Sequence, residues 1–157
     1  MSILLLLVTF SITQAAPAAQ TYKPKVGQEG RDAVWVPTSP ELVEKMLDMA
    51  KVTPNDFLID LGSGDGRMVI AAAKRGTRAL GVEFNPEMVK LAQQLAKEAG
   101  VSDRATFVQG DMFEADISKA TVLALFLLPE NLKQLEPKFR ALTPGTRIVV
   151  NSFGVPG

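Results

Sequence analysis

The stretch Phe57–Gly66, FLIDLGSGDG, decides the fold of this chain. A short apolar run ends at Asp60 and gives way to three glycines at alternating positions. This pattern predicts a buried parallel strand that turns sharply into a helix over residues 67–74. Glycine reaches backbone angles closed to other residues, and without a Cβ it lets a ligand lie against the main chain. We therefore interpret the turn as a cofactor-binding loop, with the amide groups at the helix start facing the ligand.

The spacing of the glycines separates the cofactor classes. A dinucleotide fold has the spacing G-x-G-x-x-G, whereas here the third glycine comes one residue early and Arg67 stands at the expected glycine. A P-loop is also excluded, because no Gly-Lys-Ser/Thr follows. Residues 60–66, DLGSGDG, instead resemble the E/D-x-G-x-G-x-G signature of class I methyltransferases, which bind S-adenosylmethionine (SAM). The cofactor-binding residues predicted from this loop are Asp60, Leu61, Gly62, Ser63, Gly64 and Gly66. A glycine-rich turn without a ligand is the alternative.

Length and composition limit the chemistry. The 157 residues suffice for one domain with one core, and 46% apolar with 22% charged residues is typical of a globular protein. Lys plus Arg equals Asp plus Glu at 17 each, so the total charge gives no indication of nucleic-acid binding. The chain has no cysteine and no histidine, which excludes disulfides, thiolate nucleophiles, the usual zinc sites and histidine acid–base catalysis. We expect no metal site.

The N-terminus predicts an export signal. Residues 3–13 form an apolar run of the length of a signal-peptide core, too short for a stable membrane span, and small residues follow at 14–19. The basic n-region of such signals is absent, so an uncleaved hydrophobic anchor or a buried helix are the alternatives. A cleaved signal implies a periplasmic or secreted protein; otherwise it is cytoplasmic or membrane-anchored. Residues 20–34 have no period and read as a mobile entry segment before the domain at 35–157.

Predicted strands and helices alternate through the rest of the chain, which indicates an α/β protein with a Rossmann-like parallel sheet. Ser39 and Asn85 are the predicted N-caps of two helices, each followed by proline. The predicted strands are 57–60, 79–83, 106–109, 121–126 and 147–152, and the predicted helices are 40–50, 67–74, 86–99 and 130–142. A complete class I methyltransferase has seven strands, so five indicate that the C-terminal part is missing.

Two further acids fall at predicted strand ends. Glu83 closes the second strand 23 positions after Asp60, where nucleotide-binding folds place a carboxylate that accepts hydrogen bonds from the ribose hydroxyls. Phe84 follows it as a further cofactor residue. After the third strand, class I methyltransferases commonly have an acid that accepts the adenine amino group and then an amide that meets a ring nitrogen; Asp111 and Met112 stand there. An exposed strand-end acid is the alternative for Glu83.

The resemblance extends from Trp35 to Phe153. The stretches 36–38, 60–66, 110–116, 127–130 and 138–147 resemble bacterial signal-peptide-bearing relatives of the mitochondrial lysine methyltransferases that act on the ATP-synthase c-ring protein and, more distantly, seven-strand histone lysine methyltransferases. The resemblance implies methyl transfer from SAM to a nucleophile, with a protein lysine as the leading acceptor. A small-molecule acceptor, or a non-catalytic module that binds SAM or a nucleoside, are the alternatives.

The catalytic residue is the least defined prediction. Residues 126–129 stand where many amine methyltransferases have Asn or Asp, then Pro-Pro and an aromatic residue, but this chain has no polar side chain there. Phe126 stands where the resembling relatives often have tyrosine. Thr38 and Asn131 are the substitutes that we predict. Trp35, the only tryptophan, is interpreted as a hydrophobic plug on the sheet, with a wall of the substrate pocket as the alternative.

Overall fold

The structure is a computed structural model that describes residues 22–152. The predicted export signal at residues 1–19 lies outside the described residues. In chain order the elements are α1 (Pro40–Met49), β1 (Phe57–Leu61), α2 (Arg67–Lys74), β2 (Arg78–Glu83), α3 (Pro86–Glu98), β3 (Ala105–Gln109), β4 (Val122–Leu125), α4 (Pro129–Arg140) and β5 (Arg147–Val150). Residues 22–38, which precede α1, are called the N-terminal arm below. Among the described residues, no helix is both long enough and apolar enough to cross a membrane.

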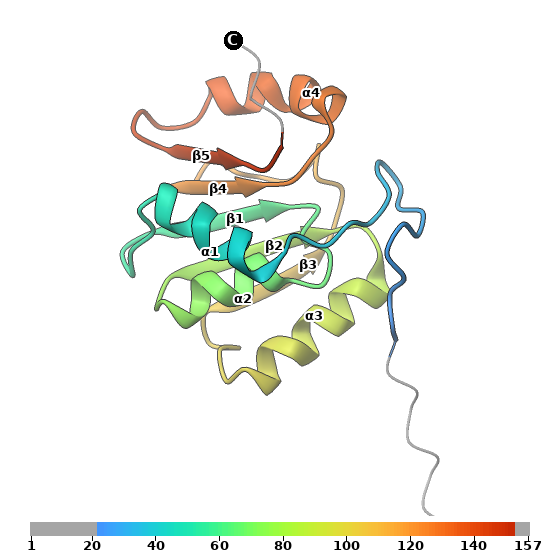
Figure 1. The fold of residues 1–157 in the computed structure, drawn as a ribbon. Coiled ribbons are helices and arrows are strands. Elements are labelled where there is room, and N and C mark those ends of the chain that lie inside the picture. Colours follow the sequence, from blue (N-terminus) through green and yellow to red (C-terminus); the bar gives the residue numbers. More distant parts are fainter. Residues whose placement is uncertain (1–21, 153–157) are drawn as a thin grey trace, which may run out of the picture.

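The five strands form one parallel sheet in the order β3-β2-β1-β4-β5. The order reverses between β1 and β4, because the chain first winds outward through β2 and β3 and then returns to the other side of β1. In open sheets of this kind, ligands bind beyond the carboxyl ends of the strands at such a reversal. The glycine loop after β1 lies at this point, and the N-terminal arm runs beside the strand tips (Figure 1).

Apolar side chains cover both faces of the sheet. Helices α1, α2 and α3 pack on one face, where Leu58 and Val122 contribute to the core, whereas α4 packs on the other, where Ile59 and Leu123 do so (Figure 1). Successive residues of a strand point to opposite faces, so neighbours such as Leu58 and Ile59 enter different halves of the core. The continuous apolar runs of β1 and β4 are the consequence of this double coverage.

The predicted helix starts are confirmed. Ser39 Oγ accepts a hydrogen bond from the Leu42 N–H at 3.3 Å, and Asn85 Oδ1 accepts one from the Glu87 N–H at 2.9 Å. Each cap satisfies an amide that lacks an intrahelical partner. Strand β4 is shorter than predicted and ends at Leu125, so Phe126 belongs to the loop that follows. That loop continues to the start of α4, which has no side-chain cap.

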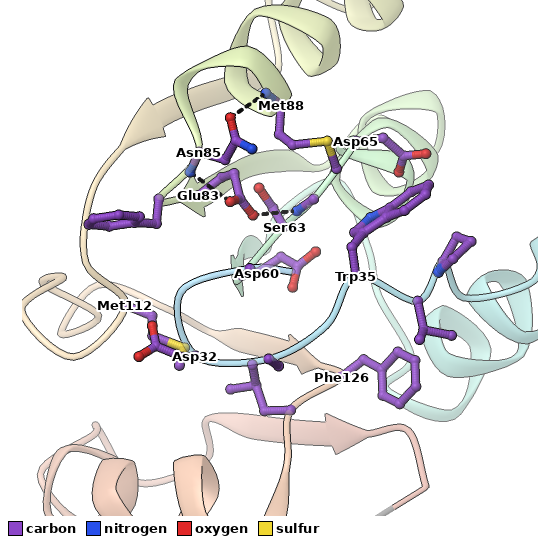
Figure 2. A pocket seen from close by; sticks show the side chains of 18 of the residues that line it. Asp32, Trp35, Asp60, Ser63, Asp65, Glu83, Asn85, Met88, Met112 and Phe126 are labelled. Atoms are coloured by element: carbon purple, nitrogen blue, oxygen red, sulfur yellow. Dashed lines mark hydrogen bonds between the residues drawn. The ribbon is translucent and has the colours of Figure 1, made fainter. Parts of the chain in front are cut away.

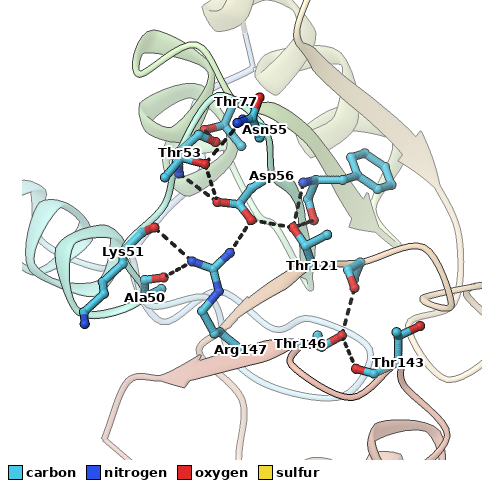
Figure 3. A network of polar contacts seen from close by, with 12 residues as sticks. Ala50, Lys51, Thr53, Asn55, Asp56, Thr77, Thr121, Thr143, Thr146 and Arg147 are labelled. Carbon is cyan, nitrogen blue, oxygen red and sulfur yellow. Dashed lines mark hydrogen bonds and ion pairs between the residues drawn. The ribbon is translucent and has the colours of Figure 1, made fainter.

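A polar network ties the strands together at the amino end of the sheet (Figure 3). The Asp56 carboxylate accepts hydrogen bonds from the Thr53 N–H at 2.8 Å and the Thr121 hydroxyl at 2.8 Å, and it is ion-paired with Arg147. Arg147 also donates to the carbonyl oxygen of Ala50 at 2.7 Å. The network thereby connects the end of α1, β1, the start of β4 and β5, so its role is structural.

Candidate functional site

A cavity of about 230 Å³ lies between the N-terminal arm and the carboxyl ends of β1, β2 and β4. The glycine loop, the residues that follow β2 and β3, and the 126–128 loop form its walls, and residues 28–38 of the arm cover it. Figure 2 shows Asp60, Glu83 and Trp35 around this space. The topology thus brings together residues from four separate parts of the sequence at the predicted place.

The amides of the glycine loop bond within the protein, so the prediction that they face a ligand is wrong. The Gly62 and Ser63 N–H groups both donate to the carbonyl oxygen of Val82, at 2.8 and 3.1 Å. The Gly64 N–H donates to Glu83 Oε2 at 2.9 Å, and Gly66 N–H donates to the carbonyl of Ser63 at 2.9 Å. Because these donors are satisfied, the loop does not provide the bare amide groups that bind a phosphate.

Close packing explains two of the three glycines. A Cβ on Gly66, where φ is +79°, would lie 2.5 Å from the ring of Phe107 in β3. A Cβ on Gly64, where φ is +56°, would lie 2.7 Å from Trp35 Nε1. Gly66 is therefore needed for helix–strand packing, and Gly64 for contact with the N-terminal arm. This also places Trp35 against the glycine loop as a wall of the cavity, which was the alternative interpretation from the sequence.

Asp60 is the most perturbed acid of the site. Its side chain is only 7% exposed, lines the cavity and points into it (Figure 2). Burial, and then the nearby negative charges of Glu83 and Asp65, raise the pKa of Asp60 well above its ordinary value of 3.8. A buried carboxyl with acidic neighbours is stabilised as an anion by a positively charged ligand. Perturbed acids in a cavity are typical of functional sites.

Glu83 links the second strand to the glycine loop. Its Oε2 accepts the Gly64 N–H at 2.9 Å, and its Oε1 accepts the Asn85 N–H at 2.8 Å. Each carboxylate oxygen has a second lone pair, so both retain acceptor capacity towards the cavity. The side chain is thus fixed by two backbone bonds before any ligand arrives. This fits the predicted ribose ligand, whose two hydroxyls require acceptors in a set position.

The arm is anchored beside the glycine loop by an arginine. Arg67 donates from Nε to Asp65 Oδ1 at 3.0 Å and from Nη2 to Asp65 Oδ2 at 2.5 Å, a bidentate pair that raises the pKa of Arg67. Its Nη1 donates to the carbonyl oxygen of Thr38 at 2.7 Å. Arg67, which excluded a dinucleotide motif in the sequence, therefore holds the end of the arm over the cavity.

The residues predicted at the adenine end also lie together, with one addition. Met112 lines the cavity and is buried, and Phe84 is exposed at its edge. Asp111 lies between two lining residues, and its Oδ1 accepts the Phe113 N–H at 2.9 Å. The addition is Arg31 of the arm, whose guanidinium contacts both Phe84 and Asp111. No local pattern in the sequence signalled Arg31, since its partners are distant in the chain.

The three catalytic candidates separate into two groups. Thr38 and Phe126 line the cavity. Asn131 does not: the first turn of α4 buries it, and its Oδ1 has no hydrogen-bond partner in the described part of the chain. Leu61 and Gly66 are likewise buried outside the lining and support the loop from behind. The structure therefore brings Thr38 and Phe126, but not Asn131, to the place where an acceptor could meet the cofactor.

Geometry and charge together indicate the kind of ligand. Satisfied amides leave the loop without its anion-binding groups, whereas carboxylates from β1, the loop and β2 surround the cavity. Such a site suits a cationic centre attached to a ribose, and it does not suit a pyrophosphate. The walls also include Trp35, Phe126 and Leu127, which keep water from part of the cavity. These residues fit a sulfonium nucleoside.

The comparisons with known proteins agree with this interpretation. Residues 60–157 match the ANTKMT methyltransferase domain, and residues 11–102 match the histone methylation protein DOT1. A protein-lysine N-methyltransferase of Saccharolobus islandicus (strain REY15A) is 44% identical over 126 residues, which cover 78% of each chain. A human lysine N-methyltransferase named for the ATP synthase c-ring protein is 35% identical over 123 residues, 78% of this chain and 52% of the human protein. The chain thus spans about half the length of that relative.

A solved structure shares the fold and the sequence. The crystal structure of an RNA methyltransferase from Salinibacter ruber, in complex with S-adenosyl-L-homocysteine (SAH), has a TM-score of 0.74 and 51% sequence identity. The match covers 76% of this chain and 80% of that one. Fold and site therefore define a class I SAM-dependent methyltransferase. Within that class, the chain belongs to the ANTKMT methyltransferase domain family.

Proposed function

We propose that this protein transfers a methyl group from SAM to the amine of a protein lysine. The observation that carries the cofactor half of the proposal is the buried Asp60 carboxyl, which faces the cavity beside a glycine loop with satisfied amides. The acceptor half is supported by the names of the archaeal and human relatives, both of which are lysine N-methyltransferases.

The described residues suggest how the cofactor is held. Asp60, with Asp65 nearby, lies at the glycine loop and suits the cationic amino-acid end of SAM. Glu83, fixed by its two backbone bonds, suits the ribose hydroxyls. Phe84, Asp111 and the amide of Met112 suit the adenine, through a ring face, an acceptor and a donor. When bound, SAM supplies a methyl group that is already activated by the positive sulfur.

The protein's remaining tasks are alignment and the exclusion of water. Phe126, Leu127 and Leu128 form one wall of the cavity, and Thr38 and Trp35 of the arm form another. A lysine amine has an ordinary pKa of about 10.4 and must be neutral to act as a nucleophile. Apolar walls favour the neutral form, because burial penalises the charged ammonium. Since the chain has no histidine, a carboxylate or water accepts the lysine proton.

RNA is the competing acceptor, because the Salinibacter protein is named an RNA methyltransferase. RNA binding relies on clustered positive charge against the phosphate backbone, and this chain has equal numbers of basic and acidic residues. Several of its arginines are paired with acids, including Arg67, Arg75 and Arg147. The charge balance therefore favours a protein acceptor.

Transfer of tritiated methyl from SAM to a cell lysate tests the proposal. One portion of the lysate is pretreated with ribonuclease and another with protease, and the labelled product is hydrolysed for amino-acid analysis. Label in methyl-lysine that survives ribonuclease supports the proposal. Label that disappears with ribonuclease identifies an RNA acceptor, and label in neither macromolecule points to a small molecule. SAM binding without transfer to any acceptor would identify a non-catalytic module.

A further inference from the structure

The tip of the N-terminal arm contains a tight turn that places Arg31 at the adenine end of the cavity. The Gly30 N–H donates to the carbonyl oxygen of Ala33 at 3.0 Å, which closes the turn. Further along, the Gly27 N–H donates to the carbonyl of Trp35, and the Trp35 N–H donates to that of Gln28, both at 2.9 Å. These backbone bonds fold the arm back on itself. Arg31 is therefore presented by an ordered turn.

Arg31 makes two contacts with predicted adenine ligands. Its guanidinium carbon lies 4.6 Å from the centre of the Phe84 ring, within the range of a cation–π interaction. Its Nη1 lies 2.8 Å from Asp111 Oδ2. Because Asp111 Oδ1 already accepts the Phe113 N–H, both oxygens of this carboxylate are engaged. The Phe113 amide and Arg31 lower the pKa of Asp111, which keeps it an anion.

The guanidinium and an adenine ring have matching chemistry here. Both are planar, both stack on an aromatic face, and both offer N–H donors to a carboxylate. An adenine amino group that approaches Asp111 meets the oxygen that Arg31 now holds. The cavity beneath the arm is about 230 Å³, which is smaller than the roughly 300 to 1,000 Å³ of sites that enclose small molecules. Something must move before a whole cofactor fits.

We propose that Arg31 is an intramolecular competitor of the cofactor: it occupies the adenine subsite at Phe84 and Asp111, and the arm must swing away before SAM or SAH can bind. The proposal rests on the proposed function, because it takes these two residues as the adenine ligands. The arm then sets the fraction of molecules that are open to the cofactor, and the apparent affinity is reduced by that fraction. Exposed ion pairs and cation–π contacts are each weak, so the expected effect is modest.

The test is calorimetric titration of SAH into wild-type protein and the Arg31→Ala variant. We expect Arg31→Ala to bind SAH about three- to tenfold more tightly, which corresponds to about 0.7 to 1.4 kcal/mol. Arg31→Lys keeps the charge but loses the planar group, and its affinity should fall in between. Arg104→Ala is the matched control, since it removes the same charge from an exposed pair with Asp103 before β3 and should leave SAH affinity unchanged.

Two further readouts separate competition from a merely structural role. Raising the salt concentration from about 0.02 M to about 0.5 M screens the Arg31–Asp111 pair, so SAH affinity should rise in the wild type and stay constant in Arg31→Ala. Trp35, the only tryptophan, lies on the arm, so its fluorescence reports arm movement in stopped-flow mixing with SAH. We expect Arg31→Ala to bind SAH with a higher association rate and an unchanged dissociation rate.

The outcomes are distinct. Unchanged or weaker SAH binding by Arg31→Ala overturns the competitor, because Arg31 would then be inert or would help to hold the cofactor. If the wild type binds SAH in that case, the proposed function survives and only this inference fails. If neither protein binds SAH or SAM, the proposed function and the inference fall together.

Discussion

Asp56 and Asp60 lie four residues apart at opposite ends of β1, and they show how partners decide the role of a buried acid. Their exposed fractions are nearly equal, 6% and 7%. Although burial alone would raise the pKa of Asp56, hydrogen bonds from Thr121 and Thr53 and the charge of Arg147 lower it below 3.8. Burial and two acidic neighbours raise the pKa of Asp60 well above that value. Equal burial thus gives opposite shifts.

The difference has a thermodynamic consequence for each end of the sheet. Asp56 stabilises the fold above its unfolded pKa, and this contribution is lost as pH falls through its lowered folded pKa. Asp60 behaves in the opposite sense: its protonated form stabilises the fold at low pH, and that contribution is lost as pH rises through its raised folded pKa. One end of the sheet is built for stability, and the other accepts a cost in stability that a bound cation can relieve.

Removing Asp56 should produce the largest change in folding. Asp56→Ala leaves Arg147, Thr121 and the Thr53 amide without their acceptor, and we expect a loss of about 2 to 3 kcal/mol in the free energy of unfolding. Denaturant titration measures it. Asp103→Ala, at an exposed surface pair, is the control and should cost less than about 0.5 kcal/mol. A loss of similar size in both variants would show that the network is not special.

Replacing Asp60 should affect binding instead of folding. Asp60→Asn removes the buried charge, so the free energy of unfolding at neutral pH should stay level or rise, while affinity for SAM falls about ten- to thirtyfold. Calorimetry and denaturant titration on the same preparation measure both. Marked destabilisation with intact SAM binding would reverse the roles that we assign to Asp56 and Asp60.

Thr121→Val should give a smaller effect in the same direction as Asp56→Ala. The Thr121 hydroxyl donates to Asp56 at 2.8 Å and accepts the Phe57 N–H at 2.9 Å, and valine keeps the shape without these bonds. We expect a loss of about 1 to 2 kcal/mol in the free energy of unfolding, with SAH affinity unchanged. Thr106→Val, at an exposed position of β3, is the matched control. Equal stabilities of the two variants would contradict the prediction.

Local patterns in the sequence predicted most of the fold. Helix starts at Ser39 and Asn85, the bounds of α2 and the five strands follow from capping chemistry and apolar periodicity, which are properties of neighbouring residues. The parallel topology then brings the strand-end residues Asp60, Glu83 and Asp111 to one edge. These acids could be predicted because the fold class fixes where strand ends lie.

Long-range contacts could not be predicted in the same way. The amides of the glycine loop were expected to face a ligand, but their acceptors include Val82 and Glu83, which come from another strand. Arg31 lies in a segment without periodicity, so nothing in its neighbourhood indicated contact with Phe84 and Asp111. Such contacts depend on how the arm crosses the finished sheet, which no short stretch of sequence specifies.

The most direct test is calorimetric titration of SAM and SAH into the full chain across a range of pH. SAM has a positive sulfur and SAH does not, so only SAM should favour the ionised Asp60 carboxyl. We predict that the preference for SAM over SAH weakens as pH falls through the raised pKa of Asp60, by up to about tenfold per pH unit, and that Asp60→Asn abolishes this dependence. A SAM-to-SAH ratio that is the same at every pH in the wild type, or no binding of SAM at all, would contradict a carboxylate-lined sulfonium site.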